Sequence, residues 1–227
     1  MNALLLCAGR GERLRPLTDT LPKPLVPVAG HPMLDYHLRA LAAAAVQRVV
    51  INLSWLGEQI RAAVGDGRRY GLEVRYSEEG PEPLETGGAA VRARALLGEA
   101  PFLVINADVW CDVPLDALVE AGLPGDDLAR VVLVDNPPHH PGGDFSIDGG
   151  RLVSRTDRAF TFSGIGLYRH AFFNGYPERF SLADPLRRYA AQGRVGAVHH
   201  PGAWFDMGSR ERLDALRAFL EGPNAQS

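Results

Sequence analysis

The single lysine of the chain stands in a stiff segment that could hold a phosphate. Of the 24 basic residues, 23 are arginine and only Lys23 is lysine. Lys23 lies between Pro22 and Pro24, and because proline fixes its own φ and restricts the residue before it, the segment is held extended. A compact ammonium on a rigid segment suits a polyphosphate, whereas arginine presents a wide planar fork. We therefore predict that Lys23 contacts a phosphate group.

A glycine-rich loop precedes this lysine. Residues 8–16 read AGRGERLRP and directly follow an apolar run. Gly9 and Gly11 would let backbone N–H groups approach an anion, and Arg13 would add positive charge. The pattern lacks the third glycine of the dinucleotide fingerprint and the Gly-Lys-Ser/Thr of the P-loop. An anion-binding loop is the prediction, with a plain tight turn as the alternative.

Two aspartates stand where a metal-assisted reaction would need them. The apolar run 102–105 leads into Asn106 and Asp108, and residues 203–209, AWFDMGS, place Asp206 just before a predicted helix. Ligands of parallel sheets bind beyond the carboxyl ends of the strands, and alternation along a strand puts Asn106 and Asp108 on one side. Carboxylates there suit Mg²⁺, and two separated aspartates fit a phosphoryl-transfer metal clamp. A turn residue or a helix flank is the simpler alternative for each aspartate.

A second glycine motif, LETGGA at residues 84–89, precedes a helical pattern. Thr86 could cap that helix, and Gly87 and Gly88 would allow the backbone to approach a ligand closely. Glycines at a helix start also occur for structural reasons, so both interpretations stay open.

The run from residue 6 to residue 28 resembles the signature of the sugar-1-phosphate nucleotidyltransferases. The motifs around Asp108 and Asp206 extend the likeness over nearly the whole chain. The chain departs from the family pattern at Cys7, where the family mostly has alanine, and at Ala107, where it has glycine. The resemblance implies a three-layer, Rossmann-like α/β fold, known as the nucleotide-diphospho-sugar transferase fold.

The same resemblance implies a set of site residues. A nucleoside triphosphate would be held by the glycine loop and the lysine, and Mg²⁺ by Asp108 and Asp206. The catalytic residues would be Arg13, Lys23, Asp108 and Asp206. The residues implied to contact the nucleotide are Ala8, Gly9, Gly11, Glu12, Arg13, Lys23, Gly87, Gly88 and Asn106.

The sugar phosphate is expected to bind in the second half of the chain. Many hexose 1-phosphate members carry a Glu-Lys-Pro segment whose lysine meets the sugar phosphate. This chain has no lysine there, so Arg155 or Arg158 would act, or the metal alone. The histidine pairs 139–140 and 199–200 have no further metal-ligating residues beside them and are expected to face solvent. The residues implied to bind the sugar are Asp144, Asp157 and Gly164.

The substrates are implied by the sugar-side segments. Residues 135–145 and 161–166 are most similar to the members that act on N-acetylmuramate 1-phosphate, so UTP and that sugar phosphate are the expected substrates, in peptidoglycan sugar recycling. A mannose- or glucose-1-phosphate nucleotidyltransferase using GTP or dTTP, or a phosphocholine cytidylyltransferase, remains an alternative. Outside this class stand a regulatory subunit that senses nucleotide sugars and an unrelated α/β nucleotide-binding domain. The joint presence of Asp108 and Asp206 favours an enzyme.

Short apolar runs alternate with helical patterns, which predicts a mostly parallel mixed sheet with helices on both faces. Strands are predicted at residues 3–7, 48–53, 73–76, 102–105, 131–134 and 195–199, and helices at 33–44, 56–64, 86–97, 115–120, 182–192 and 210–220. The β-like pieces 144–147, 151–153 and 160–168 are predicted to form a small hairpin lobe over one sheet edge on the sugar side. One domain, 1–227, would combine a nucleotide-binding half (1–135) with a sugar-binding half and closing helix (136–227), and residues 222–227 would fray.

Composition excludes several classes of protein. Hydrophobic residues make up 46% of the 227 residues, enough for a sizeable core, and a net charge of −3 argues against a nucleic-acid binder. No stretch approaches the roughly 20 apolar residues of a membrane helix. Two cysteines, Cys7 and Cys111, do not make a disulfide scaffold, so a cytoplasmic protein is expected. The expected partners are small-molecule substrates, and the chain is expected to be a monomer or a small homo-oligomer.

Overall fold

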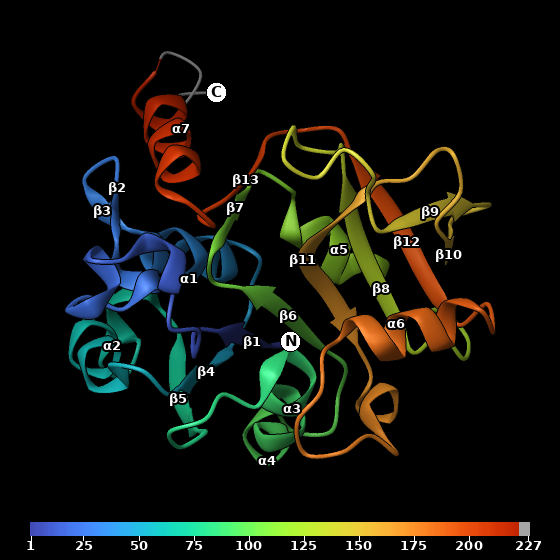
Figure 1. Cartoon of the computed structure of the whole chain (residues 1–227). Coiled ribbons are helices and arrows are strands. Elements are labelled where there is room, and N and C mark those ends of the chain that lie inside the picture. The colour runs from blue at the N-terminus through green and yellow to red at the C-terminus, as the bar shows by residue number, and fades with distance from the viewer. Residues whose placement is uncertain (223–227) are drawn as a thin grey trace.

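A nine-stranded sheet organises the computed structural model, which describes residues 1–222 (Figure 1). Its strands, in the order in which they lie side by side, are β5 (Glu73–Glu78), β4 (Arg48–Leu53), β1 (Asn2–Leu6), β6 (Phe102–Asn106), β11 (Thr161–Tyr168), β8 (Ala129–Val134), β12 (Val195–His200), β10 (Arg151–Ser154) and β9 (Phe145–Asp148). Neighbours among β5, β4, β1 and β6 are parallel, as are β8 and β12. The remaining pairs are antiparallel. All strands except β11 and β10 therefore point the same way, which confirms the predicted mixed, mostly parallel sheet.

Strand β11 is a central strand of this sheet. We predicted that residues 160–168 would join the hairpin lobe, and that prediction is wrong, because β11 lies between β6 and β8. All of its residues except Phe162 are buried, so it must be covered on both faces. Its two glycines and its serine hid this in the sequence, since they interrupt the apolar run. The hairpin of β9 and β10 does lie at one edge of the sheet, as predicted.

Helices cover both faces of the sheet, as predicted. One face carries α1 (Met33–Ala43), α2 (Gly57–Val64) and α5 (Leu115–Ala121), and the other carries α3 (Glu85–Arg92), α4 (Arg94–Leu97) and α6 (Ala183–Ala190). Successive strand residues point to opposite faces, so Leu5 of β1 packs with the first group and Leu4 with the second. Burial on both faces explains why the parallel strands read as unbroken apolar runs.

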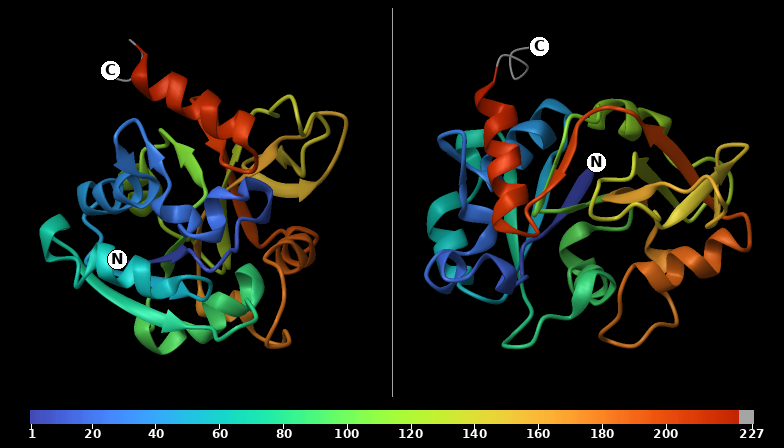
Figure 2. Two further views of the ribbon diagram at one scale, coloured as in Figure 1. Left: turned by 60° about the vertical axis from the view of Figure 1, so that its left-hand side comes forward. Right: turned by 45° about the horizontal axis from the view of Figure 1, so that its top comes forward.

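The C-terminal helix α7 (Arg210–Glu221) closes the molecule against its N-terminal segment. Figures 1 and 2 place α7, in red, beside the blue ribbon of β2 (Pro27–Val28) and β3 (His31–Pro32). Leu213 and Leu216 of α7 share a third apolar cluster with Val26, Val28 and Met33. The predicted closing helix is thus confirmed, and it links the two halves of the chain.

Several short elements are not evident from the sequence. The loop after β1 winds into the 3₁₀ turns η1 (Glu12–Leu14), η2 (Leu17–Asp19) and η3 (Lys23–Leu25), and further turns are η4 (Arg68–Tyr70) and η5 (His170–Phe173). A two-stranded ribbon forms from β7 (Val109–Cys111) and β13 (Trp204–Asp206). The predicted helix 86–97 is broken at Ala93 into α3 and α4. The β7–β13 ribbon matters most, because it brings the two aspartate motifs together.

Two sequence expectations concern the tail and membranes. The predicted fraying covers residues 222–227, of which 223–227 lie outside the described residues. Within residues 1–222, every helix is too short or too polar to cross a lipid bilayer.

A histidine of α1 is buried beneath the turn that carries Asp108. Burial lowers the pKa of His37 to about 4, although the backbone of Ala107, the charge of Asp108 and the backbone of Val109 offset part of the effect. In the unfolded chain the pKa is about 6.5. The unfolded state therefore binds the proton first as the pH falls, and folding stability is lost between about pH 6.5 and pH 4.

We expect His37→Gln to flatten the pH dependence of the unfolding free energy in this window, where one extra proton on the unfolded state contributes up to about 1.4 kcal/mol per pH unit. Urea unfolding at a series of pH values measures it. His31→Gln is the control, because His31 is exposed on β3 and should leave the slope unchanged. Equal slopes in both variants would contradict the assignment.

Candidate active site

A cleft of about 590 Å³ opens where β1 and β6 end. This is the edge at which ligands of parallel sheets bind, since the carboxyl ends of several strands meet there. Eight of the residues predicted for the site line it: Ala8, Gly9, Gly11, Glu12, Arg13, Lys23, Asn106 and Asp108. The structure therefore brings together the glycine loop, the lysine and the first aspartate motif.

The glycine loop leaves β1 and turns back at Gly11. Gly11 has φ +68°, a left-handed conformation that favours glycine, and it caps η1. A Cβ at this position would lie 3.0 Å from Thr18 Cγ2 and 3.3 Å from Lys23 Cβ. Thr18 Oγ1 also donates a hydrogen bond to the Gly11 carbonyl at 2.8 Å. The loop is thus packed directly against the lysine segment, which explains why both motifs serve one site.

Lys23 and Asp108 form an ion pair inside the cleft. Lys23 begins η3 and is buried, and its Nζ donates to Asp108 Oδ2 at 2.5 Å. The Asp108 side chain stays 41% exposed, so its second oxygen is open to the cleft. A charge-assisted contact of this length holds the ammonium where an anionic ligand would meet it.

Asn106 ends β6 beside a required glycine. The pairing of β11 with β8 shifts register between Phe162 and Gly166, a β-bulge in which Gly164 takes φ +83°. A Cβ on Gly164 would lie 2.7 Å from Asn106 Nδ2. Gly164 therefore packs against Asn106, which lines the cleft, and does not line the cleft itself. Its predicted contact with the sugar stays a prediction.

Asp206 reaches the edge of the cleft through the β7–β13 ribbon. It pairs in register with Val109, and Met207 N donates to the Asp108 carbonyl at 2.8 Å. Its Oδ1 accepts from Arg212 Nη1 at 2.5 Å and from Gly208 N at 2.8 Å. Its Oδ2 is buried and accepts no hydrogen bond, although His139 Nε2 lies 2.9 Å away.

The donors fit a hard divalent cation. Asp108 offers an exposed carboxylate oxygen, and Asp206 has a buried oxygen that lies beside His139 but accepts no hydrogen bond, a group that a cation would satisfy. Within residues 1–222, no third His, Cys, Asp or Glu joins these two in a compact cluster. The other ligands would then be water and substrate phosphates, which is how Mg²⁺ is usually held.

The second glycine motif reaches the cleft through Glu85 and Thr86, but its glycines do not line it. Gly87 N and Gly88 N both donate to the Phe180 carbonyl, at 2.9 and 3.3 Å, and a Cβ on either glycine would overlap Phe180 or Glu178. The structure gives these glycines a packing role, and their contact with a nucleotide stays a prediction. The prediction that Thr86 caps α3 is wrong, because its Oγ1 accepts from Leu182 N at 2.9 Å instead.

The predicted sugar residues are dispersed. Asp144 Oδ2 accepts from Phe162 N at 2.8 Å and its Oδ1 contacts His140, so Asp144 organises its own loop. Asp157 is exposed between β10 and β11. Arg155 lies beside Gly142, where a Cβ would be 3.1 Å from Arg155 Nη1. Direct contact of Asp144 or Asp157 with a sugar stays a prediction.

Of the four paired histidines, His139 and His140 are 38% and 42% exposed, as predicted, whereas the prediction is wrong for His200, whose side chain is only 14% exposed. All four nevertheless have a polar partner. Each histidine contacts an aspartate, because the loops fold back onto these carboxylates. In three of the pairs the aspartate is far away in the sequence, and in the fourth it lies in the same loop. The pairs are His139–Asp206, His140–Asp144, His199–Asp135 and His200–Asp112.

Sequence reasoning missed a buried polar network on the other side of the cleft. Asn52 Oδ1 accepts from Cys7 N at 2.6 Å, and Asn52 Nδ2 donates to Glu79 Oε1 at 2.5 Å. Asn52 and Glu79 both line the cleft. Asn52 could have been found, because it is a polar residue near the end of the apolar run 48–53, as Asn106 is at the end of the run from 102. The register sets both asparagines beside Leu6. Burial, and then the charge of Asp108, raises the pKa of the Cys7 thiol far above its usual value, so it is no thiolate nucleophile.

Comparisons with known proteins identify the family and the fold. The sequence model of the family described as Nucleotidyl transferase matches residues 2–148. N-acetylmuramate alpha-1-phosphate uridylyltransferase of Neisseria meningitidis serogroup B is 44% identical, covering 96% of this chain and 97% of that one. The protein of the same name from Caulobacter vibrioides is 33% identical, covering 96% of each chain. A Bacillus anthracis protein, provisionally assigned as a glucose-1-phosphate thymidylyltransferase and solved with a sucrose, superposes with a TM-score of 0.85 at 20% identity, covering 96% and 95% of the two chains. That likeness confirms the predicted nucleotide-diphospho-sugar transferase fold.

We expect Gly164→Ala to lower the unfolding free energy by roughly 1–3 kcal/mol more than Gly30→Ala does. Both glycines have a positive φ, at +83° and +82°, but only at Gly164 would the new Cβ meet another side chain. The comparison therefore isolates the clash with Asn106, and urea unfolding measures it. Equal losses in the two variants would show that Gly164 does not constrain Asn106.

Proposed function

The chain belongs to the nucleotidyl transferase family, and we propose that it transfers a uridylyl group from UTP to N-acetylmuramate 1-phosphate, releasing pyrophosphate. The observation that carries the reaction class is the cleft in which the glycine loop, Lys23 and Asp108 converge. The choice of substrates is supported by the 44% identity, over nearly all of both chains, to a uridylyltransferase named for that sugar phosphate.

The proposed reaction joins two anions. An oxygen of the sugar 1-phosphate attacks the α-phosphorus of UTP in line, the bond from that phosphorus to the bridging oxygen breaks, and pyrophosphate leaves. No covalent enzyme intermediate is needed, so the enzyme acts by positioning the two phosphates and stabilising their charge. The protonated thiol of Cys7 in the cleft agrees with this scheme.

Arg13 and Lys23 would counter the charge of the triphosphate. Lys23 is packed against Gly11 and held by Asp108, so its ammonium has little freedom left to lose when a phosphate binds. Arg13 lines the same cleft on an exposed stretch of the loop. The backbone between Gly9 and Gly11 lies next to both cations.

Asp108 and Asp206 would hold Mg²⁺, which when bound screens the charge of the two phosphates that must meet. Arg212 and Gly208 N fix the Asp206 carboxylate through Oδ1, which leaves Oδ2 for another partner. The backbone bond from Met207 to Asp108 sets the spacing of the two aspartate motifs.

The cellular setting follows from the substrates. UTP is a cytoplasmic metabolite, and both cysteines are free thiols, as a reducing compartment would keep them. We therefore place the reaction in the cytoplasm, in the recycling of peptidoglycan sugars.

Arg155, beside the loop that carries His139, is the proposed cation for the sugar phosphate.

A pyrophosphate-release assay with Mg²⁺ tests the proposal. UTP, dTTP, GTP and CTP are each combined with the 1-phosphates of N-acetylmuramate, N-acetylglucosamine, glucose and mannose, and with phosphocholine. Turnover confined to UTP with the muramate is the expected result. Preference for another pair would replace the substrates and keep the reaction. Silence of a folded, nucleotide-binding protein across all pairs would replace the enzyme with a regulatory subunit that senses nucleotide sugars.

We expect Lys23→Ala and Asp108→Asn each to reduce turnover about 10²- to 10³-fold, because the first removes a cation that counters the phosphate charge and the second a ligand of the proposed Mg²⁺. Arg15→Ala is the matched control. It removes a cation from the same loop, but Arg15 is exposed and pairs with Asp19. Steady-state kinetics, with circular dichroism to verify folding, measure the effect. A folded and fully active Asp108→Asn enzyme would remove that residue from the mechanism.

A further inference from the structure

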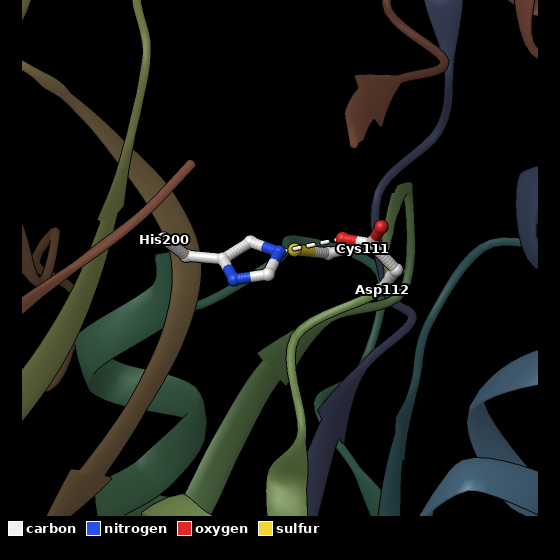
Figure 3. A group of neighbouring side chains, drawn as sticks. All are labelled: Cys111, Asp112 and His200. Carbon is white, nitrogen blue, oxygen red and sulfur yellow. Dashed lines mark hydrogen bonds and ion pairs between the residues drawn. The ribbon is translucent and has the colours of Figure 1, made fainter. Parts of the chain in front are cut away.

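A compact group of three different side chains lies outside the cleft. Figure 3 shows Cys111, Asp112 and His200 pointing toward one another. One sulfur, one oxygen and one nitrogen atom from them all lie within 4.8 Å of each other. Cys111 ends β7 and His200 ends β12, and the fold brings His200 to Asp112, 88 positions before it in the sequence. Within residues 1–222 it is the only such group of three.

The backbone holds these side chains in place from two directions. Cys111 pairs with Trp204 in the β7–β13 ribbon, and Asp112 N donates to the Ala203 carbonyl at 3.2 Å. Only residues 201–203 connect His200 to that ribbon. This connection is short, and Ala203 at its far end accepts the hydrogen bond from Asp112 N. The chain itself therefore positions the imidazole of His200 beside the other two donors.

Gly202 leaves room for the group. A Cβ at this position would overlap both His200 Nε2 and Asp112 Oδ1. Any other residue would therefore push apart the two donor atoms that meet there. The glycine thus lets His200 and Asp112 approach each other across the turn.

The donor chemistry selects the ligand. His200 Nε2 lies 2.5 Å from Asp112 Oδ1, and the His200 side chain is only 14% exposed. Burial raises the pKa of the Cys111 thiol to about 12, so without a cation the sulfur carries a proton. Thiolate, imidazole and carboxylate together form a ligand set typical of Zn²⁺, whereas Mg²⁺ prefers oxygen ligands alone.

We propose that Cys111, Asp112 and His200 bind one Zn²⁺ ion, with water in the fourth position. On binding, a sulfur–zinc bond replaces the S–H bond and that proton passes to solvent. The contact between Asp112 Oδ1 and His200 Nε2 opens to admit the ion, and His200 binds as the tautomer that keeps its one ring proton on Nδ1. The ion then ties the end of β12 to the β7–β13 ribbon. That ribbon carries Asp206, so the site would hold one wall of the cleft without taking part in the reaction.

Cobalt provides a direct test, because a thiolate bound to tetrahedral Co²⁺ gives an intense charge-transfer band. The full chain, stripped with a chelator, is titrated with Co²⁺ near neutral pH and then with Zn²⁺. We expect one equivalent of Co²⁺ to produce the band and one equivalent of Zn²⁺ to abolish it. Cys111→Ser should lose the band, and His200→Gln should weaken Co²⁺ binding at least tenfold.

The controls separate this site from its neighbours. His199→Gln changes the adjacent histidine, which contacts Asp135, and should bind Co²⁺ as the parent does. Asp108→Asn should keep the band, because it alters only the proposed Mg²⁺ site. The absence of a band in the parent, a band that persists in Cys111→Ser, or full affinity in His200→Gln would each overturn the proposal.

Thermal melting gives an independent readout. With free Zn²⁺ about a hundredfold above its Kd, the parent should melt roughly 5 °C or more higher than without it, and Asp112→Asn should show little of this shift. Circular dichroism verifies that each variant is folded, and Cys111→Ala replaces Cys111→Ser in the titration if the latter does not fold. An equal shift in the parent and in Asp112→Asn would place the ion elsewhere.

Discussion

The ion pair between Lys23 and Asp108 is the interaction on which the candidate site depends. It joins the stiff segment after the glycine loop to the turn that follows β6. On one side Lys23 lies against Gly11, so the position of the ammonium and the shape of the loop are coupled. On the other side the Asp108 carbonyl accepts a hydrogen bond from Met207, which fixes the segment that carries Asp206. Through these contacts the ion pair relates the glycine loop and the lysine segment to two parts of the chain that are far away in the sequence.

The parallel strands supply the floor of that site. Because β4, β1 and β6 are in register, Asn52, Leu6 and Asn106 lie side by side at the carboxyl edge. Two amide side chains flank the start of the glycine loop as a result. Asn52 bonds to the first backbone N–H after β1 and to Glu79, so the polar edge of the sheet is internally satisfied and ordered.

The second half of the chain is fastened to this floor by polar contacts near the ends of strands. Contacts between histidine and aspartate recur there: His139 reaches Asp206, and His199 reaches Asp135. The β-bulge of β11 brings Gly164 against Asn106. The proposed zinc ligands lie at the end of β12, where the chain crosses from the sheet back to the cleft. The ribbon of β7 and β13 is held by polar contacts of this kind together with the packing of Trp110 and Phe205 against Phe219 of α7.

The sequence by itself determined the fold class, most of the elements and the main site residues. Apolar runs alternating with helical periods specify a covered parallel sheet. A lone lysine between prolines, or an aspartate after a buried strand, can be recognised as a candidate site residue from its immediate neighbours in the sequence. What only the tertiary structure decided are pairings between distant segments: the central position of β11, the β7–β13 ribbon, the packing of Gly87 and Gly88 against Phe180 and Glu178, and the group around His200. These depend on which surfaces remain to be covered once the sheet has formed. No local pattern encodes that, because a glycine or histidine has the same neighbours in sequence whether it meets a ligand, another loop or solvent.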